Sequence, residues 1–304
     1  MKNLYEFLFN RTLSQSAMNM SSSNLNKTIY SEDDIVVQVP YSINEHGYRS
    51  ETFSKDNDVL ILGCSQTYGS GLPNEFTWAD IFSKSINKKY SRLAWPGDSI
   101  NGQVYKAFNY FKEIGKPKIV LGLFPLYRLE YPAIPREFIH PHGSLNTNGK
   151  PGSKDLDKAV MAMAYFNYDV AQFSKAPHDP AYVIPKEFTI FYNFMFIKML
   201  EEYCNSNNII FIWSVYENFE DIQKYLENHS VETLKNFLKT SNIVQIWDEE
   251  LWSKRLEVEE SVESKLQLFA ADYNQKTGMG HWGIRTNKKI AERFAEKYKE
   301  ISDD

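Results

Sequence analysis

Residues 58–71 read DVLILGCSQTYGSG, an apolar run that leads directly into a turn of small and polar residues. Apolar runs without polar alternation are typical of strands that are covered on both faces of a sheet. Further runs of this kind, each bounded by polar residues, lie at 92–95, 118–124, 208–216 and 242–247. The stretch therefore predicts the first strand of a parallel sheet, with Ser65 displayed at its carboxyl end.

Helix-like stretches separate the predicted strands. They occupy residues 75–90, 100–114, 186–205, 230–240 and 283–301. The second of them closes at Gly115, just before Pro117, which is a typical helix stop. Strands that alternate with helices form βαβ units with right-handed connections. We therefore expect an α/β fold of flavodoxin-like type with three layers, α/β/α, around a mostly parallel central sheet of about five strands.

Two segments depart from this alternation. Residues 1–55 precede the first strand and are expected to form an arm with short strands that packs on the main domain, residues 56–304. Residues 129–184 are rich in Pro, Gly, His and Asn, and this segment is too long for an ordinary connection. Two interpretations of this insertion stay open: a loop that shapes a substrate cleft, and a surface that binds a partner.

Charge and hydropathy exclude several classes of protein. The net charge is −5 and no basic run occurs, which argues against a nucleic-acid-binding face. No stretch approaches the roughly 18 apolar residues of a membrane-spanning helix, and Glu6 interrupts the apolar N-terminal stretch, which makes it a poor signal peptide. We expect a cytoplasmic or virion-associated protein without membrane contact. Cys64 and Cys204 are predicted to be buried thiols rather than a disulfide.

Candidate catalytic residues follow from the predicted sheet, because functional groups collect beyond the carboxyl ends of parallel strands. Ser65 follows the first strand, and His281 lies in a glycine-rich turn before the last helix. A serine hydroxyl is a weak nucleophile until a neighbouring imidazole takes its proton. We expect Ser65 and His281 to form such a dyad; the alternative for Ser65 is a turn residue. His140 and His142 lack further ligands, so no metal site is expected.

The order of motifs resembles the SGNH, or GDSL-like, hydrolase superfamily. The stretches that carry the resemblance are NEHGYR at 44–49, DVLILGCSQTYGSGLPNEFTW at 58–78, LAWPGDS at 93–99 and HWG at 281–283. The resemblance implies that Ser65 is the nucleophile and that the Gly97 N–H helps to bind the oxyanion. It also implies no metal and no organic cofactor.

The chain departs from the family pattern in its nucleophile and oxyanion blocks. The family's Gly-Asp-Ser is Gly63-Cys64-Ser65 here. The family's Asn at the end of the third strand, an oxyanion donor, is absent from the stretch PLYR at 125–128. Loss of one such donor typically costs about 10²–10³ in rate. Arg128 or Asn101 is a candidate replacement; Arg128 could instead form an ion pair with Glu130.

Two further positions need an interpretation. The family's Asp three residues before the histidine is Gly278 here, and Asp272 lies nine residues before His281. Asp272 can orient the imidazole if residues 273–277 bulge out; otherwise a backbone carbonyl must do so, which weakens the dyad. A literal Gly-Asp-Ser also occurs at 97–99. Because only Ser65 has the following TYGSGL context, we interpret Ser99 as a decoy.

These residues predict a serine esterase that hydrolyses an acyl ester, with an O-acetyl group on a small molecule or polysaccharide as the favoured substrate. The chain is 15% aromatic, which is compatible with a bulky core or with a surface that faces sugars or a partner. Two alternatives stay open. The fold could serve without catalysis as a binding or structural component, for example of a virus particle, or the same dyad could transfer the acyl group to an acceptor other than water.

Overall fold

The structure is a computed structural model of the chain. It describes residues 26–30, 36–69, 72–95, 98–126, 128–130, 163–165, 186–216, 222–223, 232–246 and 282–302.

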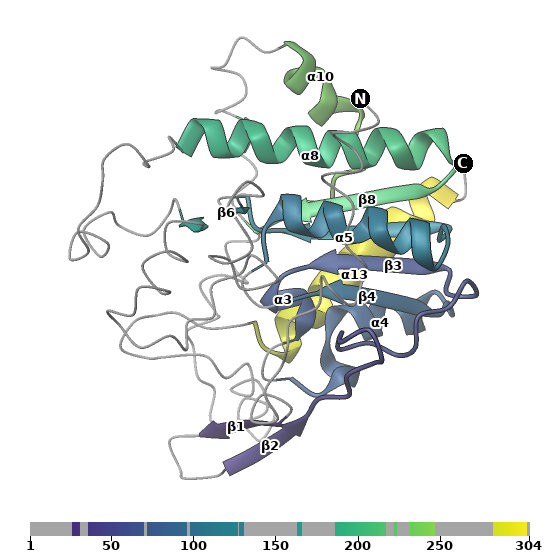
Figure 1. The fold of residues 1–304 in the computed structure, drawn as a ribbon, viewed down its shortest axis with the longest axis vertical. Helices are drawn as coiled ribbons and strands as arrows, with labels where there is room; N and C mark the ends of the chain where they lie inside the picture. The colour runs from purple at the N-terminus through teal and green to yellow at the C-terminus, as the bar shows by residue number, and fades with distance from the viewer. Residues whose placement is uncertain are drawn as a thin grey trace, which may run out of the picture.

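A parallel sheet forms the centre of the molecule (Figure 1). Its strands are β3 (Val59–Gly63), β4 (Tyr90–Ala94), β5 (Ile119–Phe124) and β8 (Ile210–Val215), in the order β4-β3-β5-β8. A parallel bridge joins Trp213 to Ile243 beyond β8, so the fifth predicted run lies where a fifth strand belongs. The resulting order, 2-1-3-4-5 in chain sequence, is the flavodoxin-like order. The predicted sheet is therefore confirmed.

Helices cover both faces of the sheet (Figure 1). The helices α5 (Ile100–Glu113) and α8 (Lys186–Ser206) pack together on one face. On the other face α4 (Trp78–Ser85) packs against α13 (Ile284–Ser302). A shorter helix, α10 (Glu232–Thr240), precedes the bridge at Ile243. The predicted three-layer α/β/α architecture is thus confirmed.

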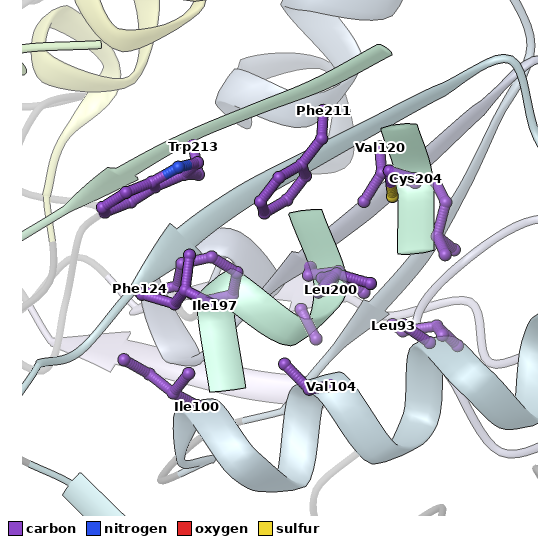
Figure 2. Packing of buried hydrophobic residues seen from close by; sticks show 14 of the residues in the cluster. Leu93, Ile100, Val104, Val120, Phe124, Ile197, Leu200, Cys204, Phe211 and Trp213 are labelled. Carbon is purple, nitrogen blue, oxygen red and sulfur yellow. The ribbon is translucent and has the colours of Figure 1, made fainter. Parts of the chain in front are cut away.

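The core between the sheet and the α5–α8 layer shows why these segments are helical (Figure 2). Apolar residues recur three or four positions apart on each helix and point toward the strands. The labelled members on the helices are Ile100, Val104, Ile197, Leu200 and Cys204, all fully buried. Burial raises the pKa of the Cys204 thiol. Both cysteines of the chain are free and buried, as the sequence predicts.

The helix predicted over residues 75–90 is wrong at both ends. A short 3₁₀ helix, η2 (Asn74–Phe76), comes first, and α4 begins only after Thr77, whose side chain accepts a hydrogen bond from the Asp80 N–H. The helix ends at Ser85, since Asn87 adopts a left-handed conformation with φ of 51°. This turn lets β4 begin at Tyr90, two residues earlier than predicted.

Residues before β3 also contribute to the core. An antiparallel pair, β1 (Asn26–Tyr30) and β2 (Val36–Pro40), comes first. Tyr41, Tyr48 and Phe53 then pack into the cluster beneath α5. The boundary drawn at residue 55 stays a prediction.

Within the predicted insertion, the structure describes two short strands. They are β6 (Arg128–Glu130) and β7 (Met163–Tyr165), which pair antiparallel. In the described part of the chain, no helix combines the length and the apolar character needed to cross a membrane.

Candidate active site

The strand order determines where a site can form. From β3 the chain passes to β4 on one side, and it then crosses to β5 on the other side of β3. In open α/β sheets, ligands bind beyond the carboxyl ends of the strands at such a switch point. Ser65 is the second residue after β3, so it lies at this position.

Small residues let the chain turn sharply at Ser65. The residue begins a one-turn helix, α3 (Ser65–Tyr68), and Gly69 closes it with φ of 75° and an N–H that donates to the Ser65 carbonyl over 3.0 Å. A side chain at Gly63 would collide with Thr67, and one at Gly69 would collide with Thr77. Glycine is therefore required on both sides of the turn.

The Ser65 hydroxyl contacts a thiol. Ser65 Oγ lies 3.6 Å from Cys64 Sγ, and Cys64 Sγ is hydrogen-bonded to the Tyr216 hydroxyl over 2.9 Å. Cys64 is fully buried, and Tyr216 follows the last residue of β8. The Cys64 thiol thus connects the Ser65 turn to the end of β8.

His281 lies outside the described residues, but its neighbour Trp282 is buried beside the Ser65 turn. The Trp282 N–H donates to Gln66 Oε1 over 2.9 Å. The Trp282 ring also meets the Tyr216 ring edge to face, with centroids 5.1 Å apart. The residues that follow Ser65 and His281 in sequence are therefore in direct contact. The dyad itself stays a prediction.

A buried asparagine fixes the start of α13. Asn287 Nδ2 donates to the carbonyl oxygens of Trp282 and Gly283, both over 3.0 Å. Asn287 Oδ1 accepts from the Trp78 N–H at the start of α4 over 2.9 Å. The segment after His281 is therefore anchored to α4 as well as to the Ser65 turn.

A buried arginine fixes the loop that follows α3. The Arg49 guanidinium donates to the carbonyl oxygens of Tyr68, Gly69 and Leu72, over 3.1, 2.6 and 2.5 Å. The central carbon of the guanidinium, Cζ, lies 4.0 Å from the centroid of the Tyr41 ring. Burial, and secondarily the charge of nearby Arg92, lowers the pKa of Arg49 to about 10. The side chain stays charged at neutral pH.

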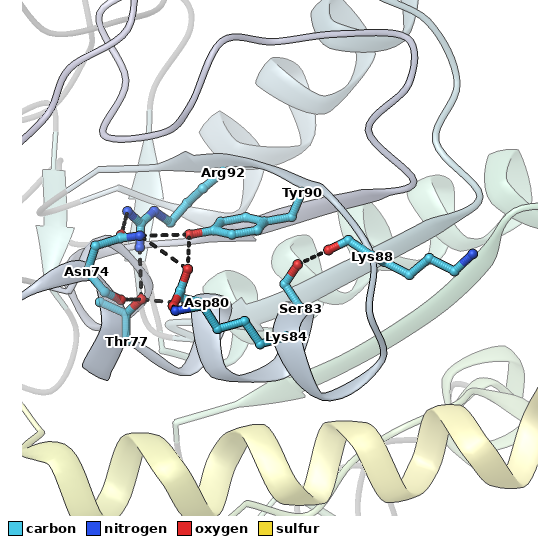
Figure 3. Close-up of polar contacts among 8 residues, drawn as sticks. All are labelled: Asn74, Thr77, Asp80, Ser83, Lys84, Lys88, Tyr90 and Arg92. Carbon is cyan, nitrogen blue, oxygen red and sulfur yellow. Dashed lines mark hydrogen bonds and ion pairs between the residues drawn. The ribbon is translucent and has the colours of Figure 1, made fainter.

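A second buried arginine, Arg92 on β4, continues this network (Figure 3). It donates to Asn74 Oδ1 over 2.6 Å, to Thr77 Oγ1 over 3.2 Å and to the Arg49 carbonyl over 2.8 Å. Together the two guanidiniums bind polar groups on both sides of the loop between α3 and α4. Sequence reasoning missed this pair, although Arg49 belongs to the NEHGYR motif.

The Gly-Asp-Ser triplet at 97–99 is described at Asp98 and Ser99, and both side chains have structural roles. The Ser99 hydroxyl accepts from the Gly102 N–H over 3.2 Å and thereby caps α5. Asp98 forms an ion pair with Lys106 over 2.7 Å, and both side chains are buried. These contacts support the interpretation of Ser99 as a decoy.

The oxyanion candidates are only partly described. Gly97 lies outside the described residues, but Trp95, two residues before it, stacks on Tyr68 of α3 with centroids 5.4 Å apart. Asn101 is buried in the first turn of α5, and its Oδ1 accepts from the Ser99 hydroxyl over 2.7 Å. The stacking of Trp95 on Tyr68 thus brings the end of β4 into contact with α3.

The remaining candidates stay predictions. Arg128 begins β6, where its backbone pairs with Tyr165; its side chain and that of Glu130 lie outside the described part. Asp272, His140 and His142 lie there too. Among the described residues, no group of three or more His, Cys, Asp or Glu side chains could hold a metal ion.

Comparison with known proteins gives matches among solved structures. The chain is similar to a member of the lipolytic protein G-D-S-L family from Veillonella parvula: 14% identity, 80% of this chain and 96% of that chain covered, TM-score 0.37. It is similar to the psychrotrophic esterase EstA from Pseudoalteromonas sp., at 11% identity, with 82% and 100% covered and a TM-score of 0.41. It is also similar to a family two carbohydrate esterase from Clostridium thermocellum, at 11% identity, with 88% and 67% covered and a TM-score of 0.40.

No family model matches the sequence, and no curated protein matches it. What this chain does is proposed from its own residues.

Proposed function

We propose that the chain is a serine esterase in which Ser65 is the nucleophile and His281 is the general base. The observation that carries the proposal is the hydrogen bond between Trp282 and Gln66, which joins the neighbours of both residues beyond the carboxyl end of β3. A nucleophile and its base must lie within hydrogen-bond reach, and this contact supports that arrangement.

The proposed reaction is an acyl transfer in two halves. His281 takes the proton of Ser65 Oγ while the oxygen attacks the ester carbonyl carbon, and the N–H groups of Ser65 and Gly97 hold the tetrahedral oxyanion. The carbonyl re-forms, the alcohol leaves with the proton from His281, and an acyl-enzyme remains. Water then attacks the acyl-enzyme in the same way and releases the acid.

We propose an O-acetyl ester on a carbohydrate or a small molecule as the substrate. The chain is 15% aromatic, a content compatible with a sugar-facing surface, although the largest described rings, among them Trp78, Trp95 and Trp213, are buried in the core. The comparison of p-nitrophenyl acetate with the butyrate and octanoate esters tests this choice. A preference for acetate is expected, and a preference for octanoate would favour a lipid ester instead.

A second candidate is a binding or structural protein that keeps the fold without catalysis. Two observations favour it: Ser65 is buried, and the chain has Gly278 where the family has an acid. A protein of this kind would bind an ester-bearing polymer without cleaving it.

Covalent labelling of the serine distinguishes the two candidates. A fluorophosphonate probe forms an Oγ–P bond and releases fluoride only where a base activates the serine. We expect labelling at Ser65 by peptide mass spectrometry, together with turnover of p-nitrophenyl acetate that is lost in Ser65→Ala. A wild-type protein that neither labels nor turns over acetyl esters would favour the binding role.

A further inference from the structure

We propose that Gln66 and Tyr216 are positioning residues that hold the His281-bearing turn against the Ser65 turn. The inference rests on the proposed function, because it concerns how the base is kept in place. Neither side chain is assigned a contact with the substrate.

Gln66 acts from the side of the nucleophile. It is the second residue of α3, and its Oε1 accepts the Trp282 N–H over 2.9 Å across 216 positions of sequence. That N–H belongs to the peptide bond that links Trp282 to His281, and a peptide bond is planar. A hydrogen bond that fixes this N–H therefore restrains the backbone of the proposed base.

Tyr216 acts from the end of β8. Its own N–H donates to the Phe124 carbonyl over 3.1 Å, which attaches its backbone to the end of β5. Its hydroxyl is hydrogen-bonded to Cys64 Sγ, and its ring packs edge to face on Trp282. One side chain thus contacts both the residue before Ser65 and the residue after His281.

The sequence around His281 shows why such contacts are needed. Gly278 cannot offer a carboxylate to the imidazole, and the candidate acid Asp272 lies nine residues before His281. In this proposal, contacts that the turn makes with other elements contribute to the orientation of the imidazole. Displacement of a catalytic group by about 1 Å can cost about 10²-fold in rate.

Gln66 is tested by two substitutions that differ in one property. Gln66→Met keeps the length but removes the acceptor, whereas Gln66→Glu keeps an acceptor oxygen. We expect Gln66→Met to lower kcat on p-nitrophenyl acetate by about 10- to 100-fold with little change in KM. Gln66→Glu should recover most of the kcat. Gln245→Met, at an exposed position, is the control for the same change of side chain.

Tyr216 is tested by Tyr216→Phe, which keeps the ring but removes the hydroxyl. The matched control is Tyr110→Phe, because the buried Tyr110 hydroxyl is hydrogen-bonded to Ser91 over 2.9 Å near the opposite end of the sheet. Both variants should lower Tm to a similar degree, and only Tyr216→Phe should lower kcat. Cys64→Ala should add little to Tyr216→Phe, since both remove the same hydrogen bond.

Hydrogen exchange measures the hydrogen bond between Trp282 and Gln66 independently of activity. The Trp282 amide should exchange faster in Gln66→Met than in the wild type, and its protection should return in Gln66→Glu. Unchanged kcat in both Gln66→Met and Tyr216→Phe, in a wild-type enzyme that is active, would overturn this inference alone. An inert wild type that does not label at Ser65 would overturn the proposed function, and the positioning role with it.

Discussion

Two Gly-x-Ser turns lie side by side at the carboxyl end of the sheet, one after β3 and one after β4. In the turn after β4 the serine hydroxyl is fully used: Ser99 accepts from Gly102 and donates to Asn101. In the turn after β3, Ser65 is the first residue of α3, but its hydroxyl does not cap the helix. Among the described residues, this hydroxyl contacts only the Cys64 thiol, a weak hydrogen-bonding group. What distinguishes the turns is the use of the hydroxyl, not the match to the Gly-Asp-Ser triplet.

The largest expected effect is on catalysis at the first turn. Ser65→Ala should lower kcat on acetyl esters by on the order of 10⁴- to 10⁶-fold, because only the slow direct attack of water on the carbonyl remains. Tm should stay nearly unchanged, since among the described residues the hydroxyl has one weak hydrogen bond, to the Cys64 thiol. Stopped assays with p-nitrophenyl acetate and a thermal melt measure the two quantities. A dead Ser99→Ala beside an active Ser65→Ala would reverse the comparison.

At the second turn the largest expected effect is on stability. Asp98→Asn leaves the buried Lys106 ammonium without its partner, so the free energy of unfolding should fall by about 3–5 kcal/mol. Urea unfolding measures this loss. The control is Asp58→Asn, which breaks the ion pairs with the exposed Lys118 and with Lys88 and should cost much less, because solvent screens both pairs. Equal losses in the two variants would contradict the structural role of Asp98.

Asn101, which follows the second turn, is a candidate oxyanion donor. If its amide replaces the missing oxyanion donor, Asn101→Ala should lower kcat by about 10²-fold, with KM nearly unchanged. Arg128→Ala is the matched comparison, because Arg128 is the other candidate. Loss of kcat in Arg128→Ala alone would assign the donor to the end of β5.

The smallest expected effect is the loss of stability when the Ser99 cap of α5 is removed. Ser99→Ala removes a side-chain hydrogen bond at the start of α5 and should lower the free energy of unfolding by about 1 kcal/mol. Substantial esterase activity should remain. Ser99→Asp retains a capping oxygen and should recover the lost stability, as a thermal melt would measure.

Much of the fold could be predicted because its signals are local. The run DVLILG and its counterparts are apolar enough to identify buried strands, and the stop at Gly115 marked the end of α5 within one residue. Ser65 could be placed at the sheet edge for the same reason. The break at Asn87 was missed, since the apolar period of the flanking helix runs on into β4.

The contacts that surround Ser65 could not be predicted from local patterns. Tyr216 lies 152 positions from Cys64, and Trp282 lies 216 positions from Gln66. Neither pair has a spacing or a motif that marks it, because side chains on different strand ends meet only after the sheet has formed. The burial of Arg49 is not marked locally either, because the same motif holds a second charged residue, Glu45, which is not buried.

The Arg49 contacts have a consequence for how the molecule unfolds. Three carbonyl groups of the loop after α3 depend on a side chain that precedes β3, while Tyr48 and Phe53 fill the core beside it. Residues 41–55 and the Ser65 loop should therefore open together as one cooperative unit in native-state hydrogen exchange. A shortened chain that starts at Asp56 would retain every strand of the central sheet and every proposed catalytic residue, yet it would lose the order of the loop that displays the nucleophile.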